Sequence, residues 1–175
     1  MKSYGFSIIE LLIVVIVVGI LAAIAIPQFS RQQQKAKTSE VPGMFAAIKQ
    51  SQHAYKAEYG RFLSTGTSES DVYPALLGSG EPKKKKWEPG TSTNWYQLGV
   101  QPPDYYVYCG YVTLSGSAGD VPSGVNGVKS FRNQTPQKPW FYIMAHCDLD
   151  GNSAVNTMFV TSSERTDVIE MNGGM

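Results

Sequence analysis

The feature that most constrains this chain is an apolar segment close to its start. From Phe6 to Ile26 the only clearly polar side chains are Ser7 and Glu10. As an α-helix this segment would extend about 31 Å, which matches the hydrocarbon core of a bilayer, about 30 Å thick. It therefore predicts a membrane-spanning helix. A carboxylate costs free energy in such a helix, on the order of 2.5–3.5 kcal/mol at the centre and less near the end, so Glu10 needs a functional reason.

Three interpretations of this segment compete. A cleaved secretory signal is consistent with the small residues Ala23 and Ala25. The apolar run is longer than the usual 7–15 residues of such a signal, however, and an internal carboxylate is unusual there. A plain membrane anchor leaves Glu10 unexplained. The third interpretation gives the carboxylate a partner, and it comes from a family resemblance.

The sequence KSYGFSIIELLIVVIVVGILAAIAIPQF resembles the N-terminus of type IV pilins and pseudopilins. In that family a short basic leader ends in Gly, prepilin peptidase cleaves after it, and the new first residue, usually Phe, is N-methylated. Lys2, Gly5, Phe6 and Glu10 fit this pattern. The resemblance covers roughly residues 1–60. It implies a cleaved leader at 1–5 and a helix at 6–26 that spans the membrane before assembly and forms the filament core afterwards.

The resemblance also suggests why Glu10 is there. Cleavage after Gly5 would leave a positive α-amine on Phe6 within the membrane, and Glu10 of one subunit could pair with that amine of a neighbour. Pairing would remove much of the cost of burying either charge. We therefore expect Phe6 and Glu10 to direct assembly of a helical homopolymer. Other implied partners are prepilin peptidase, an assembly ATPase, a platform protein and an outer-membrane pore.

The basic leader also predicts a location. Lys2 is expected to stay in the cytoplasm, which places the rest of the chain in the periplasm. The precursor would lie in the bacterial inner membrane, and the assembled subunit would lie in a pilus at the cell surface.

The helix is expected to continue beyond the apolar run. Gly19 and Pro27 bound the stretch with the weakest helical propensity, which the resemblance implies loosens in the filament, and Pro27 should bend the helix. The amphipathic continuation, 27–62, should bend again at Pro42, although a true break there stays open. Gly60 should end it. One face of this continuation carries an apolar stripe with one polar interruption: Val41, Phe45, Ile48, Gln52, Tyr55, Tyr59 and Phe62.

The remaining sequence predicts an α+β type IV pilin fold, in which the second half of the helix packs on an antiparallel sheet of about four strands. Residues 63–104 are rich in Ser, Thr, Gly and Pro, and should form a long αβ-loop. Residues 105–175 should form the sheet domain. Its strands are expected at 105–113, 140–147, 155–162 and 167–171, with a Gly-, Ser- and Pro-rich excursion at 115–139.

A run of four lysines lies in the predicted αβ-loop: Lys83, Lys84, Lys85 and Lys86. A solvated loop is the simpler interpretation. A patch for DNA or another anionic surface is the alternative, with Trp87 and Trp95 available for stacking on bases. The net charge of +1 gives no general attraction to nucleic acid.

The two cysteines, Cys109 and Cys147, fall in the first two predicted strands. If these strands are neighbours in an exported domain, a disulfide is expected; two small buried apolar side chains are the alternative. After Cys147, the residues Asp148, Asp150 and Asn152 alternate as in a calcium loop, and some pseudopilins bind calcium in a C-terminal loop. The bidentate Glu of an EF-hand is missing, so a tight Asp-Gly turn is the simpler interpretation.

No pattern in the sequence points to an enzyme. His53 and His146 belong to no metal-binding spacing, and there is no phosphate loop or nucleophile elbow. We therefore expect no cofactor other than that possible calcium, and a structural subunit of a type IV pilus for adhesion, twitching motility or DNA uptake. The nearest alternative is a pseudopilin of a type II secretion system, and a membrane-anchored periplasmic binding module is a more distant one.

Overall fold

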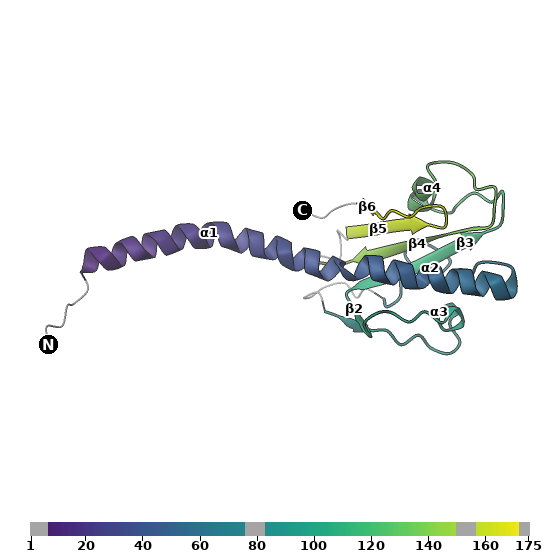
Figure 1. Cartoon of the computed structure of the whole chain (residues 1–175), viewed down its shortest axis with the longest axis horizontal. Helices are drawn as coiled ribbons and strands as arrows, with labels where there is room; N and C mark the ends of the chain where they lie inside the picture. The colour runs from purple at the N-terminus through teal and green to yellow at the C-terminus, as the bar shows by residue number, and fades with distance from the viewer. Residues whose placement is uncertain (1–6, 76–82, 150–156, 172–175) are drawn as a thin grey trace. The chain divides into compact units, whose positions relative to one another are not determined.

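The computed structural model describes residues 7–75, 83–149 and 157–171. The chain divides into two compact units, Met1–Ala36 and Lys37–Met175, and the second is called the head below (Figure 1). The predicted cleavage after Gly5 and methylation of Phe6 concern positions outside the described residues.

The first unit consists of most of helix α1, Ile8–Thr38, which contains Pro27 without ending there. A proline inside a helix removes one backbone hydrogen bond, which a long helix tolerates as a local distortion. None of the side chains of α1 is buried. From Ile8 to Tyr59 the chain has a helical segment long and apolar enough, by length and composition, to cross a membrane.

A second helix, α2, covers Glu40–Tyr59 after an interruption of one residue, Ser39. Ser39 keeps right-handed helical torsion angles (φ −62°, ψ −18°). The interruption precedes Pro42, which has no N–H to donate to the carbonyl four residues earlier and which fits well in the first turn of a new helix. At the other end Gly60 adopts φ +73° and its N–H bonds the Lys56 carbonyl, which confirms the predicted helix end.

The predicted apolar stripe is confirmed except at Tyr59, since Phe62 is buried in the core cluster beneath α2 and Tyr55 packs against that cluster. Val41, Phe45, Ile48 and Gln52 are buried, together with Met44, which the stripe did not include. The prediction was wrong at Tyr59, which is 57% exposed. Its ring stacks on Tyr55 at 4.4 Å between centroids.

Four antiparallel strands form the main sheet in the order β3-β4-β5-β6: β3 Cys109–Gly116, β4 Trp140–Cys147, β5 Thr157–Ser162 and β6 Ile169–Met171. Helix α2 lies along one face of this sheet and contacts β4 (Figure 1). This is the predicted α+β arrangement of the pilin fold, with β4 at its predicted bounds. The sequence pattern placed the other strands with errors of a few residues.

The first predicted strand, 105–113, is divided between two sheets. Its start forms β2, Tyr106–Val107, which pairs with β1, Lys85–Lys86, in a separate two-stranded sheet. Its end belongs to β3, which continues to Gly116, into the predicted excursion. The αβ-loop also contains a short helix α3, Asn94–Leu98, and the excursion contains α4, Val125–Ser130.

The sheet has a buried cluster on each face, since β4 is covered on both sides. Alternate β4 residues such as Phe141 and Ile143 join the cluster beneath α2. Their neighbours Tyr142 and Met144 join a second cluster on the opposite face, which we call the outer face. Because side chains alternate along a strand, this two-sided burial explains why β4 is apolar throughout.

Candidate functional site

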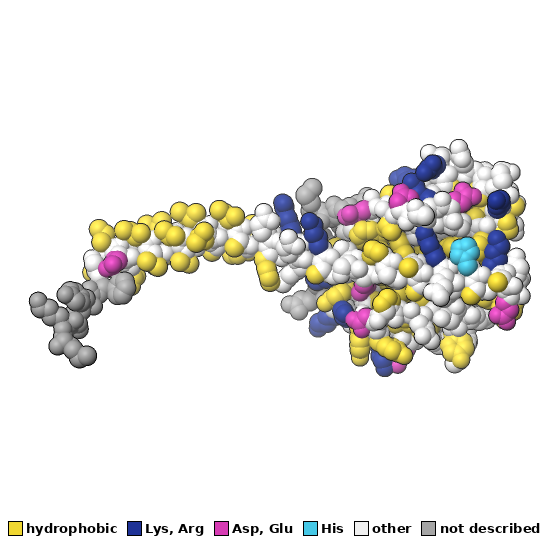
Figure 2. Space-filling model, viewed as in Figure 1, with side chains coloured by type: hydrophobic (Ala, Val, Ile, Leu, Met, Phe, Trp, Pro, Cys, Tyr) yellow, Lys and Arg dark blue, Asp and Glu magenta, His cyan; other side chains and the backbone are white. Residues whose placement is uncertain are grey.

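The surface of α1 is the first candidate site. From Ile8 to Ile26 every large apolar side chain is at least half exposed, and Ile8 is 87% exposed. In Figure 2 hydrophobic side chains cover the visible side of this helix. A continuous apolar surface of this length marks a membrane or protein contact, because water solvates it poorly. The surface therefore needs a bilayer or other helices around it.

Glu10 lies at the start of this surface, in the first turn of α1. Its Oε2 atom accepts a hydrogen bond from the Ser7 backbone N–H at 3.4 Å, and the side chain is exposed. A carboxylate at a helix N-terminus is favoured by the helix dipole and by the unpaired N–H groups there. Glu10 thus presents a negative charge next to the predicted cleavage point. Gly19 and Pro27 both lie within α1, and their loosening in a filament stays a prediction.

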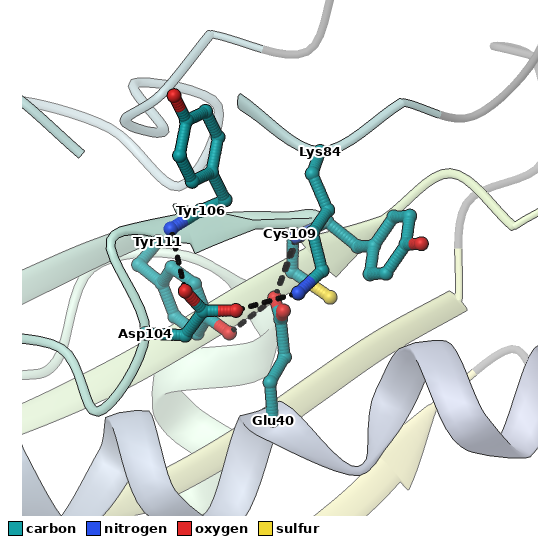
Figure 3. Close-up of polar contacts among 7 residues, drawn as sticks. Glu40, Lys84, Asp104, Tyr106, Cys109 and Tyr111 are labelled. Carbon is teal, nitrogen blue, oxygen red and sulfur yellow. Dashed lines mark hydrogen bonds and ion pairs between the residues drawn. The ribbon is translucent and has the colours of Figure 1, made fainter. Parts of the chain in front are cut away.

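A second site lies within the head and was missed by the sequence reasoning (Figure 3). Oε1 of Glu40, in the first turn of α2, accepts hydrogen bonds from the backbone N–H groups of Tyr108 (2.8 Å) and Cys109 (3.0 Å). It also accepts one from the Tyr111 hydroxyl at 3.1 Å. We call this group the Glu40 clamp, because it joins α2 to the start of β3. Its members are 68 to 71 residues apart in sequence, so no local pattern marks them.

Burial governs the electrostatics of the clamp. It raises the pKa of the Glu40 carboxyl, and the donated hydrogen bonds oppose that rise without cancelling it. Burial also raises the pKa of the Tyr111 hydroxyl, to which the nearby Glu40 charge adds. Tyr111 therefore acts as a hydrogen-bond donor to Glu40 at any ordinary pH.

Cys109 and Cys147 form a disulfide beside the clamp, with their Cα atoms 4.3 Å apart. The two residues are direct partners in the β3–β4 register. The bond joins the start of β3 to the end of β4 and closes a loop with a sequence separation of 38. Covalent closure of such a loop restricts the unfolded chain.

The lysine run has several partners within the head. Lys84 forms an ion pair with Asp104 at 2.6 Å, Lys86 forms one with Glu88 at 2.5 Å, and Lys85 donates to the Ala75 carbonyl. These contacts partly neutralise the run. A nucleic-acid role for Lys83, Lys84, Lys85 and Lys86 stays a prediction.

The alternative interpretation, in which the tryptophans beside the lysines supply stacking surfaces for bases, is wrong on this point. Trp87 and Trp95 are each 3% exposed, and their rings pack edge to face at 5.1 Å. They are large apolar side chains of the core beneath α2. Their faces are therefore not available to nucleic-acid bases.

The calcium candidates lie mostly beyond the described part of the chain. Asp148 follows β4 and is partly buried, whereas Asp150 and Asn152 fall outside the described residues. Within the described ranges no three side chains of His, Cys, Asp or Glu gather in a group that could hold a metal ion. Calcium binding stays a prediction.

Comparison with known proteins agrees with the N-terminal pattern. Residues 1–26 match the family described as the prokaryotic N-terminal methylation motif. The chain is 43% identical over 61 residues to the type IV major pilin protein PilA of Myxococcus xanthus, an alignment that covers 35% of this chain and 28% of that one. It is 31% identical over 86 residues to the type II secretion system core protein G of Pseudomonas aeruginosa, covering 49% and 59% of the two chains.

A third relative is the type IV narrow pilus major component PilA5 of Thermus thermophilus, 41% identical over 49 residues, which are 28% of this chain and 42% of that one. The aligned parts thus span from 28% to 59% of these three relatives. No solved structure matches the chain significantly.

An apolar helix with an early glutamate, followed by a helix packed on an antiparallel sheet, is consistent with the pilin fold. The matches support a type IV pilin-like protein, because the N-terminal part of the chain is similar both to type IV pilins and to a type II secretion system core protein.

Proposed function

We propose that this protein is the structural subunit of a type IV pilus, polymerised through α1 into a helical surface filament. The observation that carries the proposal is the surface of α1, apolar and exposed from Ile8 to Ile26 with the Glu10 carboxylate at its start. A bilayer can cover this surface in the precursor, and neighbouring copies of the same helix can cover it in a filament. Contacts between different faces of identical subunits that do not close a ring generate a filament.

The proposed assembly signal is an ion pair between subunits. Cleavage after Gly5 creates a cationic amine on Phe6, and Glu10 of a neighbouring subunit supplies the anion. Each charge is costly when buried alone, and the pair with good geometry offsets much of that cost. The pairing therefore favours one axial register between neighbouring helices over others.

The proposed life cycle follows from the leader. The precursor lies in the bacterial inner membrane with its head in the periplasm, prepilin peptidase processes it, and the assembly ATPase, platform protein and outer-membrane pore deliver it to the cell surface. Adhesion, twitching motility and DNA uptake are the functions open to such a filament. The role is structural, and no catalytic step is assigned to any residue.

The experiment that tests the role of Glu10 compares the natural chain with two variants, Glu10→Ala and Ser7→Ala, all expressed in cells. Glu10→Ala should be inserted and processed but absent from the sheared filament fraction, because the Phe6 amine would be buried without an anion. Ser7→Ala is the matched control: it alters a neighbouring residue in the same turn and should assemble normally. Normal filaments from Glu10→Ala would contradict the proposal.

A pseudopilin of a type II secretion system is the second candidate. The observation that favours it is the match to core protein G of Pseudomonas aeruginosa, which covers more of this chain than the matches to the two pilus relatives described above. Both candidates require the same processing at Gly5. Surface filaments seen by electron microscopy and labelled by an antibody to the head would favour the pilus, whereas a secretion defect on deletion without such filaments would favour the pseudopilin.

A further inference from the structure

A pocket of about 410 Å³ lies on the outer face of the sheet, on the side opposite to the Glu40 clamp. Its lining includes Met144 and His146 from β4 and Met158 from β5. The loop residue Glu69 also lines it. Neither the filament role nor the clamp uses these side chains.

One imidazole and two thioethers line this pocket, and the sheet register makes them neighbours. Met144 and His146 are two residues apart on β4 and therefore project from the same face. Met158 is the direct cross-strand partner of His146, a position where opposing Cβ atoms lie about 4.5–5.5 Å apart. The three side chains are therefore adjacent on one face and line one pocket.

Among the described residues, one nitrogen of this imidazole has no hydrogen-bond partner. Nε2 of His146 is buried and accepts or donates no hydrogen bond among the described residues. Burial lowers the pKa of His146, and the Glu69 carboxylate opposes this without cancelling it. A neutral imidazole is the form that binds metal ions. A buried polar atom without a partner requires an explanation.

The donor set points to a soft metal. Imidazole with thioether sulfur is typical of Cu(I) sites, whereas Ca²⁺ and Mg²⁺ require oxygen ligands. Both cysteines of the chain are in the disulfide, so no thiolate competes for such an ion. The absence of a metal-binding group of His, Cys, Asp and Glu among the described residues does not concern this set, because two of its three members are methionines.

Glu69 supplies charge in the same pocket. Its carboxylate accepts hydrogen bonds from the backbone N–H groups of Asn126 (3.1 Å) and Gly127 (2.9 Å) and from the Asn126 side chain (3.1 Å). Its position is therefore fixed by the start of α4, and its negative charge favours a cation nearby.

We propose that Met144, His146 and Met158 bind one soft monovalent metal ion of the Cu(I) class. Nε2 of His146 and the two thioether sulfurs are the ligands, and Glu69 is a charge neighbour rather than a ligand. Ag(I) has the same charge and ligand preference and needs no reductant, so it is the probe of choice. The inference does not depend on whether the chain forms a pilus or a pseudopilus.

The test is a calorimetric titration of Ag(I) into the full-length, oxidised protein in detergent, followed by NMR of ¹³C-methyl methionine. We expect one saturable site per chain. The methyl signals of Met144 and Met158 should move, while that of Met44, buried on the α2 side of the sheet, should not. Ca²⁺ at the same concentration should leave all three signals in place. No saturable binding, or shifts at Met44 equal to those at Met158, would overturn the proposal.

Substitutions assign the ligands. Met158→Leu and His146→Gln should each weaken Ag(I) binding by at least about tenfold, since even partners outside the ligand shell contribute that much at metal sites. Met158→Leu conserves volume, so it keeps the test valid if His146→Gln impairs folding. The controls are Met44→Leu and His53→Gln, which should bind as the unsubstituted chain does. Unchanged affinity in Met158→Leu would overturn the assignment.

Discussion

The Glu40 carboxylate of α2 accepts a hydrogen bond from the Tyr111 hydroxyl of β3 at 3.1 Å. The same oxygen holds the backbone N–H groups of Tyr108 and Cys109, at the point where the first predicted strand leaves the small sheet and enters the main one. One side chain of the helix thus fixes the start of the strand that carries the disulfide. The clamp links helix α2 with the sheet of the head.

We predict that Glu40→Ala destabilises the head. The substitution leaves two backbone N–H groups and the Tyr111 hydroxyl without their acceptor, which should lower the free energy of unfolding by about 1–3 kcal/mol. Urea denaturation of the full-length chain in detergent measures this. Glu58→Ala, at an exposed position of the same helix, is the control and should change stability by less than about 0.5 kcal/mol. Equal stability of the two variants would show that the clamp contributes nothing.

The stability of the head should fall as the pH drops below 6.5. Burial lowers the pKa of His146 from 6.5, so the folded state binds this proton less tightly than the unfolded chain. The contribution of neutral His146 to the free energy of unfolding is therefore fully present above pH 6.5. It is lost as the pH falls through the lower pKa of this imidazole in the folded state. Denaturation curves between pH 8 and pH 4.5, about the range in which imidazoles titrate, measure the slope. His146→Gln should reduce the slope of the unfolding free energy against pH. An undiminished slope in that variant would show that other groups cause the pH dependence.

Removal of the disulfide should also destabilise the head. For a sequence separation of 38, the loss of loop-closure entropy in the unfolded chain predicts a decrease of about 2–4 kcal/mol. The measurement is urea denaturation with and without reductant. Cys109→Ala/Cys147→Ala is the control, since reductant should leave its curve unchanged. A reductant effect on that variant as large as on the natural chain would contradict the explanation.

Asp71 should have a depressed pKa. Its carboxylate accepts hydrogen bonds from the Thr67 N–H (2.7 Å), the Thr67 hydroxyl (2.6 Å) and the Ser68 N–H (3.0 Å). These contacts favour the ionised form and lower the pKa to about 2 from 3.8. An NMR titration of the carboxyl carbon measures it, and Thr67→Val should move the pKa back towards 3.8 because the hydroxyl donor is lost. A pKa near 3.8 in the natural chain would contradict the geometry.

The sequence predicted the features that depend on local patterns. The apolar helix follows from composition, the end of α2 from Gly60, and β4 from a run of β-forming residues that is buried on both faces. Even Gln52, the polar interruption of the stripe, lies at a predicted contact position. Its side chain bonds Leu63 and Thr113, but those partners could not be read from periodicity.

The features that the sequence did not predict depend on distant contacts. The Glu40 clamp and the pocket at His146 bring together residues that tertiary packing alone makes neighbours. The tryptophans beside the lysine run illustrate the same limit. Trp87 lies next to charged residues in the chain, yet it is buried because Tyr73, Trp95 and Tyr111 surround its ring. The composition of the neighbouring sequence therefore does not show whether a side chain is buried or exposed in the fold.

The most direct test of the filament account is the intact mass and N-terminal sequence of the protein sheared from the surface of expressing cells. The account predicts a chain that begins at N-methylated Phe6, with the leader 1–5 removed. A chain that begins at Ile26 would mean signal-peptidase cleavage after Ala25 and a soluble exported head. An uncut Met1 would leave only a membrane anchor, and either of these two results would contradict the assembly role assigned to Phe6 and Glu10.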